Sequence, residues 1–210
     1  MPQTRLGIIG AGELGKQVAE IAMSAGSWSS IAFFDDQRKE GEQVEGHPVV
    51  GKTQDIIETL DKGDLDGVIL GIGFHHFNVR KHWSKIGQEW PWATLMGQGC
   101  IVAPSAQIGK GSILYPGTII DRNVTVDSHN LLNLGCVIAH DCFLGPNNFL
   151  APSVTLSGFV RMGSRNFVGS GSVISSRITL GDDNLIGAGS VVVRDVPSGV
   201  KAYGNPAKEK

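Results

Sequence analysis

The chain of 210 residues is poor in cysteine and has only Cys100, Cys136 and Cys142. Their odd number and irregular spacing exclude a disulfide framework, so we expect reduced thiols and a cytoplasmic protein. Long apolar runs are also missing. No stretch reaches the roughly 18 residues that a membrane-spanning helix needs, and no signal-peptide pattern precedes the first strand, so neither membrane insertion nor secretion is expected.

An excess of positive charge is the third absence. The chain has 18 Lys and Arg residues against 20 Asp and Glu residues, which gives a formal net charge of −2. Proteins that bind nucleic acid usually carry a basic patch that attracts the phosphates. Nucleic acid is therefore not an expected partner, and an anionic membrane surface is not favoured either.

Glycine is abundant, with 29 residues, and it accompanies a six-residue repeat in the second half of the chain. An aliphatic side chain recurs at every sixth position from Val102 to Val192 without a gap. Small, branched or Asn side chains form a second column four residues later. A period of six fits neither an isolated helix nor a two-sided strand, and it predicts a parallel β-helix of short strands. The aliphatic positions are Val102, Ile108, Leu114, Ile120, Val126, Leu132, Ile138, Leu144, Leu150, Leu156, Met162, Val168, Ile174, Leu180, Ile186 and Val192.

The first hundred residues follow a different pattern. Apolar runs at 5–10, 30–34, 66–71 and 92–96 predict strands, and helical periodicity covers 14–25, a short segment at 53–60 and 78–87. Such alternation predicts a small parallel sheet with right-handed crossovers. We therefore expect a Rossmann-like α/β half domain at 1–97 and the β-helix at 98–210.

A glycine-rich turn follows the first predicted strand, and an acidic pair follows the second. Gly10, Gly12 and Gly15 have the dinucleotide-binding spacing, in which glycines let a phosphate approach the positive end of a helix. Asp35 and Asp36 could accept hydrogen bonds from a ribose or base. Only about 95 residues precede the repeat, half of a dinucleotide fold, so a nucleotide-linked substrate is favoured over NAD. A tight turn without a ligand is the alternative.

The two halves together resemble one bacterial family, the sialic-acid O-acetyltransferase-like enzymes. This family includes N-acetyltransferases of UDP- or GDP-linked 4-amino-4,6-dideoxy sugars, which serve surface polysaccharide or glycan synthesis. The resemblance rests mainly on NLGCVIAHDCFLG at 133–145 and on the acyl-CoA-transferase-like end, GAGSVVVRDVP at 187–197 with YGNPAK at 203–208. It implies a left-handed β-helix, a homotrimer, and acetyl-CoA bound between neighbouring prisms.

The register places one histidine on the outside of the prism. Ile138 points inward, so His140 lies at a corner, and on an 18-residue coil Gly158 stacks above it and leaves room for a thin ligand. Imidazoles titrate near pH 6.5, which suits a general base. The resemblance implies that His140 deprotonates the acceptor, that Asp141 tunes it, and that Asn133 helps to position the reactants. It also implies that the Gly158 amide holds the thioester oxygen.

The resemblance implies two further groups of binding residues. Two departures from the family motifs accompany them: Phe149 stands where a second histidine is common, and Glu13-Leu14 replaces His in a Gly-His-Gly loop. Glu13 could pair with the amino group of the acceptor. The nucleotide-sugar group is Gly10, Gly12, Glu13, Leu14, Gly15, Asp35, Asp36 and Gly73. The acetyl-CoA group is Phe149, Gly158, Ser170, Gly187 and Ala188.

Three alternatives remain beside amine acetylation. An O-acetyltransferase acting on a sialic-acid-like or other sugar hydroxyl would use the same base. A γ-class carbonic anhydrase would share the fold but needs three histidine ligands, and the repeat has only His129 and His140, so no metal is expected. A non-catalytic scaffold would require neither the His140-Asp141 pair nor a CoA-type terminus. The nucleobase, the sugar and the acyl group are open.

Overall fold

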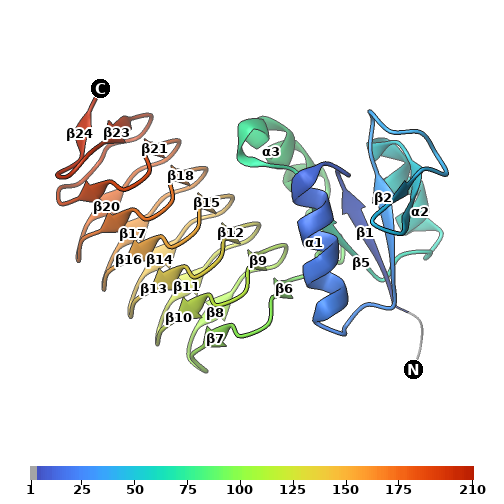
Figure 1. The fold of residues 1–210 in the computed structure, drawn as a ribbon, viewed down its shortest axis with the longest axis horizontal. Helices are drawn as coiled ribbons and strands as arrows, with labels where there is room; N and C mark the ends of the chain where they lie inside the picture. The colour runs from blue at the N-terminus through green and yellow to red at the C-terminus, as the bar shows by residue number, and fades with distance from the viewer. Residues whose placement is uncertain (1–3) are drawn as a thin grey trace. The chain divides into compact units, whose positions relative to one another are not determined.

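The computed structural model describes residues 4–210, and the internal contacts divide the chain into two compact units between Leu95 and Met96 (Figure 1). The first three residues of the predicted 1–97 domain lie outside the described residues. None of the described helices is both long and apolar enough to span a bilayer. Each unit has its own hydrophobic core.

The N-terminal unit is an α/β domain with a five-stranded sheet in the order β3-β4-β2-β1-β5. The pairs β1–β2, β1–β5 and β2–β4 are parallel, and β3 pairs with β4 in antiparallel fashion. The strands are β1 (Arg5–Ile9), β2 (Ser30–Phe34), β3 (Gln43–Val44), β4 (His47–Gly51) and β5 (Gly67–Leu70). The helices are α1 (Glu13–Ser24), α2 (Ile56–Asp61) and α3 (Phe77–Ile86), with the 3₁₀ turns η1 (Thr53–Asp55) and η2 (Phe74–His76).

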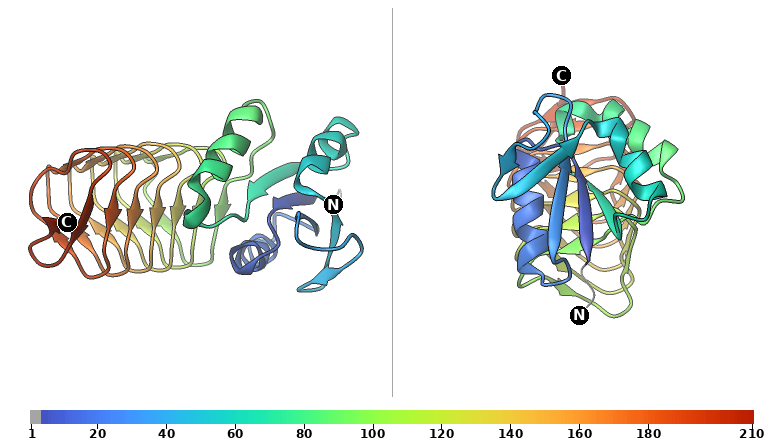
Figure 2. Two further views of the ribbon diagram at one scale, coloured as in Figure 1. Left: turned by 90° about the horizontal axis from the view of Figure 1, so that it is seen from above. Right: turned by 90° about the vertical axis from the view of Figure 1, so that its right-hand side faces the viewer.

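The side chains of the central strands alternate between the two faces of this sheet, and helices cover both faces (Figure 2, right). Ile9 and Phe34 join the core that includes Ile56 of α2 and Trp83 of α3. On the other face, the buried side of α1 approaches closely at Gly15. Because β2 and β5 lie on opposite sides of β1, the strand order reverses at β1, and such a switch point is where open α/β sheets bind ligands.

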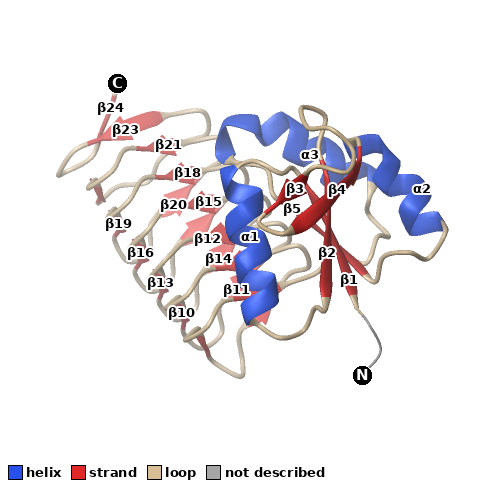
Figure 3. Cartoon of the chain, turned by 45° about the vertical axis from the view of Figure 1, so that its right-hand side comes forward, coloured by secondary structure: helices blue, strands red, loops and turns tan. Residues whose placement is uncertain are grey.

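The C-terminal unit is a left-handed parallel β-helix whose two-residue strands form three faces (Figure 3). Face 1 holds β7 (Ile101–Val102), β10 (Ile119–Ile120), β13 (Val137–Ile138), β16 (Thr155–Leu156), β19 (Val173–Ile174) and β22 (Val191–Val192). Face 2 holds β8 (Gln107–Ile108), β11 (Thr125–Val126), β14 (Phe143–Leu144), β17 (Arg161–Met162) and β20 (Thr179–Leu180). Face 3 holds β6 (Leu95–Met96), β9 (Ile113–Leu114), β12 (Leu131–Leu132), β15 (Phe149–Leu150), β18 (Phe167–Val168), β21 (Leu185–Ile186), β23 (Lys201–Tyr203) and β24 (Lys208–Glu209).

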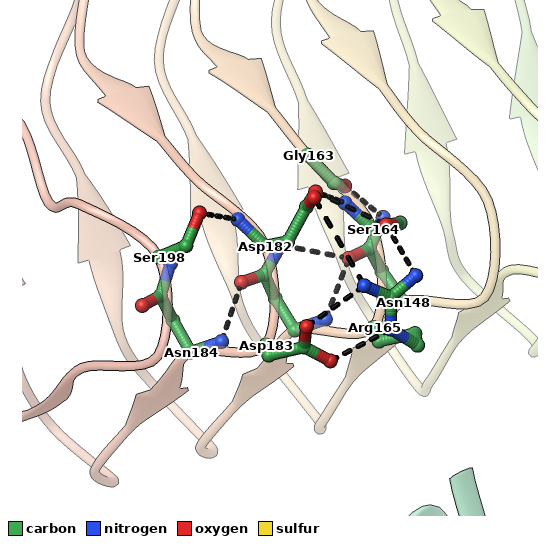
Figure 4. Close-up of polar contacts among 9 residues, drawn as sticks. Asn148, Gly163, Ser164, Arg165, Asp182, Asp183, Asn184 and Ser198 are labelled. Carbon is green, nitrogen blue, oxygen red and sulfur yellow. Dashed lines mark hydrogen bonds and ion pairs between the residues drawn. The ribbon is translucent and has the colours of Figure 1, made fainter. Parts of the chain in front are cut away.

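The six-residue columns point inward as predicted. Every aliphatic position from Leu114 to Val192 is at most 1% exposed, while Val102 and Ile108 in the first coil are half-buried. The second column is buried too, and at one corner it consists of asparagines. Along Asn130, Asn148, Asn166 and Asn184, each side-chain Oδ1 accepts the backbone N–H of the next coil at 2.8–2.9 Å. Figure 4 shows Asn148 and Asn184 among the polar contacts of this corner. This ladder satisfies buried polar groups that the turns would otherwise leave without partners.

Three corners join the faces. Corner 1 leads from face 1 to face 2, corner 2 from face 2 to face 3, and corner 3 from face 3 back to face 1. Each corner has one column of residues with positive φ, a conformation that glycine adopts without strain and large side chains rarely adopt. The column is Asn123, Asp141, Phe159 and Arg177 at corner 1, and Gly117, Gly135, Ser153, Gly171 and Gly189 at corner 3.

The strand predicted at 92–96 does not join the five-stranded sheet of the N-terminal domain, because β6 pairs with β9 on face 3 of the β-helix. Only Leu95–Met96 of the 92–96 segment is a strand, and Trp92 forms an isolated bridge with Val68. The Trp92 side chain is buried and donates its indole N–H to the carbonyl of Gly87 at 2.6 Å. The apolar run therefore reflects core packing of the tryptophan and not a regular strand.

Candidate active site

The glycine-rich turn after β1 contains three glycines with different surroundings. Gly10 has a φ of +101°, and a Cβ there would lie 3.0 Å from the carbonyl oxygen of Gly71 after β5. A Cβ on Gly15 would lie 2.1 Å from the carbonyl oxygen of Gly10. Around Gly12, by contrast, an added Cβ would meet no atom within 4 Å. Folding therefore explains the first and third glycines, and the second matches the position at which a backbone approaches a phosphate.

The acidic pair at the end of β2 is engaged within the domain. Asp35 Oδ2 accepts the N–H of Ala11 at 2.7 Å, which ties it to the glycine-rich turn. Asp36 Oδ1 accepts the N–H of Thr53 at 2.9 Å and the hydroxyl of the same residue at 3.0 Å. Both carboxylates thus fix loops at the carboxyl end of the sheet.

The two residues that depart from the family loop, Glu13 and Leu14, begin α1. Glu13 is 85% exposed in its side chain and forms an ion pair with Lys16 at 2.7 Å. The hydrogen bond from Lys16 lowers the pKa of Glu13 below its usual value, so this carboxylate is ionised. Leu14 is half-buried. The predicted pairing of Glu13 with an acceptor amine therefore has to compete with Lys16.

The second loop of the expected nucleotide site runs from Gly71 to Gly73. Gly73 precedes η2 and, like Gly12, has no atom within 4 Å of an added Cβ. Arg80 of α3, which sequence reasoning missed, is 1% exposed and donates from Nη1 to the carbonyl of Ile72 at 2.6 Å. The buried guanidinium of Arg80 thus fixes the loop 71–73 by a hydrogen bond to its backbone.

At corner 1 of the β-helix, His140 follows β13 and its side chain is 39% exposed, as the register predicts. Its Nδ1 lies 2.9 Å from Oδ2 of Asp141. Asn123, one coil earlier, donates from Nδ2 to the other oxygen of Asp141 at 3.1 Å. The hydrogen bonds of His140 and then Asn123 hold the pKa of Asp141 below its ordinary value. An ionised carboxylate only accepts hydrogen bonds, so Nδ1 carries the proton and Nε2 has a free lone pair.

The space beside Gly158, above His140, is not open as expected. A Cβ on Gly158 would lie 2.7 Å from Cε1 and 2.8 Å from Nε2 of His140, so the imidazole itself fills the space that we expected for a ligand. The Gly158 amide donates to no acceptor among residues 4–210. It is therefore available to a bound oxygen, as the resemblance implies.

The remaining predicted residues lie away from His140 in the same chain. Asn133, Ser170, Gly187 and Ala188 belong to corner 3, and Phe149 is on face 3, where it is 8% exposed and packs against Phe167 with ring centroids 5.7 Å apart.

Their local environments differ. Asn133 Oδ1 accepts the N–H of Leu134 at 2.7 Å. Gly187 donates its amide to Ala202 at 2.9 Å and lies under the ring of Tyr203, whereas Ser170 and Ala188 are exposed. One chain does not bring these residues and His140 together.

Sequence reasoning missed two neighbours of His140. Asn123 and Phe159 stand 18 residues before and after Asp141, so the length of one coil was a signal that could have found them. Among residues 4–210, no group of three or more His, Cys, Asp or Glu side chains is placed to hold a metal ion.

The chain is similar to a family of protein domains and to several solved structures. The family of PglD N-terminal domains matches residues 5–86. The acetyltransferase domain of PglB from Neisseria gonorrhoeae FA1090, solved with acetyl coenzyme A, is 31% identical, with a TM-score of 0.91 over 99% of this chain and 100% of that one. PerB from Caulobacter crescentus, solved with CoA and GDP-perosamine, is 30% identical, with a TM-score of 0.87 over 100% of this chain and 98% of that one. WeeI from Acinetobacter baumannii AYE is 25% identical, with a TM-score of 0.85 over 99% and 100%. Among curated proteins, none matches the chain significantly.

Proposed function

Since the chain belongs to the bacterial sugar N-acetyltransferases of the hexapeptide-repeat family, we propose that it moves acetyl from acetyl-CoA to the amine of a UDP- or GDP-linked 4-amino-4,6-dideoxy sugar. The product would serve surface polysaccharide or glycan synthesis. The observation that carries the proposal is the exposed His140, whose Nδ1 is bound to an ionised Asp141 that Asn123 holds in place.

His140 is the general base in this proposal. Its Nε2 lone pair takes a proton from the sugar amine as the nitrogen attacks the thioester carbonyl, and Asp141 stabilises the imidazolium that forms. The free Gly158 amide donates to the carbonyl oxygen as negative charge develops on it. The tetrahedral intermediate then expels the CoA thiolate, which receives the proton from His140. Amide, CoA thiol and neutral imidazole result.

The glycine-rich turn supports a nucleotide-linked acceptor over a free sugar. Gly12 has no steric reason to lack a side chain, and it lies at the start of α1, where the helix dipole favours a phosphate. Gly73 offers a second open backbone position. Gly10, Gly15, Asp35 and Asp36 shape this cradle, while Glu13 and Leu14 border it.

We also propose that the active site forms between copies in a homotrimer. The acetyl-CoA residues Ser170, Gly187 and Ala188, with Asn133, lie at corner 3, whereas His140 and Gly158 lie at corner 1. They can meet only if corner 1 of one copy faces corner 3 of the next. Phe149 would line the acetyl end of the groove.

The test is release of free CoA thiol with acetyl-CoA and UDP-, GDP- or dTDP-linked 4-amino sugars, beside the matching 4-hydroxy sugars. We expect turnover with a UDP- or GDP-linked amine, and a loss of about 10²–10⁴-fold in kcat for His140→Asn. Turnover only with hydroxy sugars would establish the O-acetyltransferase alternative. A His140→Asn variant with full activity would exclude His140 as the base.

A further inference from the structure

Phe159 is a bulky apolar residue in the positive-φ column of corner 1, and burial within the single chain does not explain its presence there. It adopts a φ of +63°, which is rare for a bulky side chain and costs free energy. Its side chain is nevertheless 40% exposed, so little apolar burial compensates for this strain. The other positive-φ residues of corner 1 are polar or charged. A residue that keeps a strained backbone conformation without burying its side chain points to a functional contact of that side chain.

That contact is with the base. The rings of Phe159 and His140 are perpendicular, at 89°, with centroids 5.1 Å apart, which is the favourable edge-to-face geometry. Phe159 also donates its backbone N–H to the carbonyl of His140 at 3.1 Å. The guanidinium of Arg177, one coil further, lies 4.4 Å from the Phe159 ring centroid and holds that ring in turn.

The imidazole needs such a contact because it is attached to the prism by two freely rotating bonds. The hydrogen bond to Asp141 fixes Nδ1, but rotation about that bond would still swing Nε2. Gly158 lies on one side of the ring, where an added Cβ would come within 2.8 Å of Cε1 and Nε2. Phe159 supplies a second wall. Together the three contacts restrict the orientation of the Nε2 lone pair, and a small misplacement of a base is costly in rate.

We propose that Phe159, held by Arg177, is a positioning residue that fixes the orientation of His140 for proton abstraction, an inference that rests on the proposed function. Phe159 does not contact the reacting atoms in this role. It acts through the imidazole, so replacing it should change kcat and leave substrate affinity unchanged.

The first test compares Phe159→Leu with Phe159→Tyr. We expect Leu to lower kcat about three- to tenfold, the rate equivalent of one aromatic pair, with both KM values unchanged within about twofold. Tyr retains the ring and should restore kcat. The control is Phe143→Leu on face 2, an equally exposed phenylalanine at 38%, which should keep wild-type kcat. A higher KM with unchanged kcat would show that the ring contacts substrate, and altered sedimentation would show that it serves assembly; either result overturns the proposal.

The second test needs no turnover. In protein with ¹³C-labelled histidine, the Cε1–H signal of His140 is assigned by its loss in His140→Ala. Phe159→Leu should move this signal, because the ring current disappears, and broaden it, because the imidazole gains alternative orientations; Phe143→Leu should leave it in place. An unmoved signal refutes the contact. If wild-type protein releases no thiol but the signal moves, the proposed function fails while the contact stands.

Discussion

A methyl group added at Gly158 would lie 2.7 Å from Cε1 of His140, closer than real side chains approach. The imidazole must then swing away and lose its bond to Asp141, while the Gly158 amide is retained. We expect Gly158→Ala to lower kcat about 10²-fold, which is the scale of lost base catalysis.

The matched control for this change is Gly145→Ala. It creates a comparable contact, 2.9 Å from the carbonyl oxygen of Gly163, at corner 2. Both variants should lose stability in urea unfolding, but only Gly158→Ala should lose turnover per folded molecule. Equal kcat values for the two variants would contradict the assigned role of Gly158.

Two inward-pointing cysteines should make the free energy of unfolding depend on pH in the alkaline range. Burial raises the pKa of the Cys136 thiol and of the Cys142 thiol to about 11, from 9.0 for a free thiol. An unfolded chain releases these protons above pH 9 and the folded chain does not. The stabilisation is therefore complete below pH 9 and is lost as pH rises to 11, by at most about 3 kcal/mol for each thiol.

The measurement is the urea midpoint between pH 8 and pH 11. The double variant Cys136→Val and Cys142→Val suits the prism, because Val154 and Val160 occupy the same columns one coil later. Its midpoint should fall less steeply with pH than that of the wild type. Parallel curves would mean that the thiols ionise as readily in the folded chain as in the unfolded one.

At the scale of one element, the asparagine ladder couples successive coils. Asn166 donates from Nδ2 to Asn148 Oδ1 at 3.0 Å, and its Oδ1 accepts the N–H of Asn184 at 2.9 Å. Asn166→Ala leaves that buried N–H without an acceptor, so we expect a loss of about 2–3 kcal/mol in the free energy of unfolding. Urea unfolding measures the loss, and faster hydrogen exchange at the Asn184 amide locates it.

A serine at the same place is the matched variant. In the first coils, Ser112 Oγ accepts the N–H of Asn130 at 3.2 Å, which shows that a serine in an inward column can replace the asparagine acceptor. Asn166→Ser should therefore recover part of the loss. If serine and alanine are equally destabilising, cavity formation and not the hydrogen bond explains the cost.

Most of the β-helix was predictable because its core depends on one spacing. An inward column at every sixth residue fixes which side chains are buried, and it placed His140 at an outer corner. Contacts between coils were harder to predict. The coil length puts Asn123 below Asp141, but the rotamers decide that they bond. The same holds for the packing of Gly158 against His140, where sequence reasoning expected an open space.

In the N-terminal domain, the spacing of Gly10, Gly12 and Gly15 predicted the turn, since Gly10 and Gly15 each have a steric reason in the fold, whereas Gly12 has none. The bond from Ala11 to Asp35 was not predictable, because it depends on how two loops meet at the end of the sheet. The same is true of Arg80, a buried charge on an otherwise amphipathic helix. A pattern of hydrophobic residues carries no information about such polar contacts.

At the scale of the whole molecule, the proposed site residues lie on different corners, so the proposed function would make activity a property of an assembly. If each site combines corner 1 of one copy with corner 3 of its neighbour, two inactive variants can complement each other. His140→Ala removes the base at corner 1. Ala188→Trp adds bulk at an exposed position of corner 3 and leaves His140 intact.

Refolding the two variants together at a 1:1 ratio should restore roughly a quarter of wild-type turnover, because a random cyclic trimer pairs two intact corners at one site in four. Each variant refolded alone should remain inactive. Thiol release measures the recovery, and sedimentation confirms that the mixed protein is trimeric. Trimeric but inactive mixtures would place the whole site within one chain, in which case His140 would have to work with residues of its own corner.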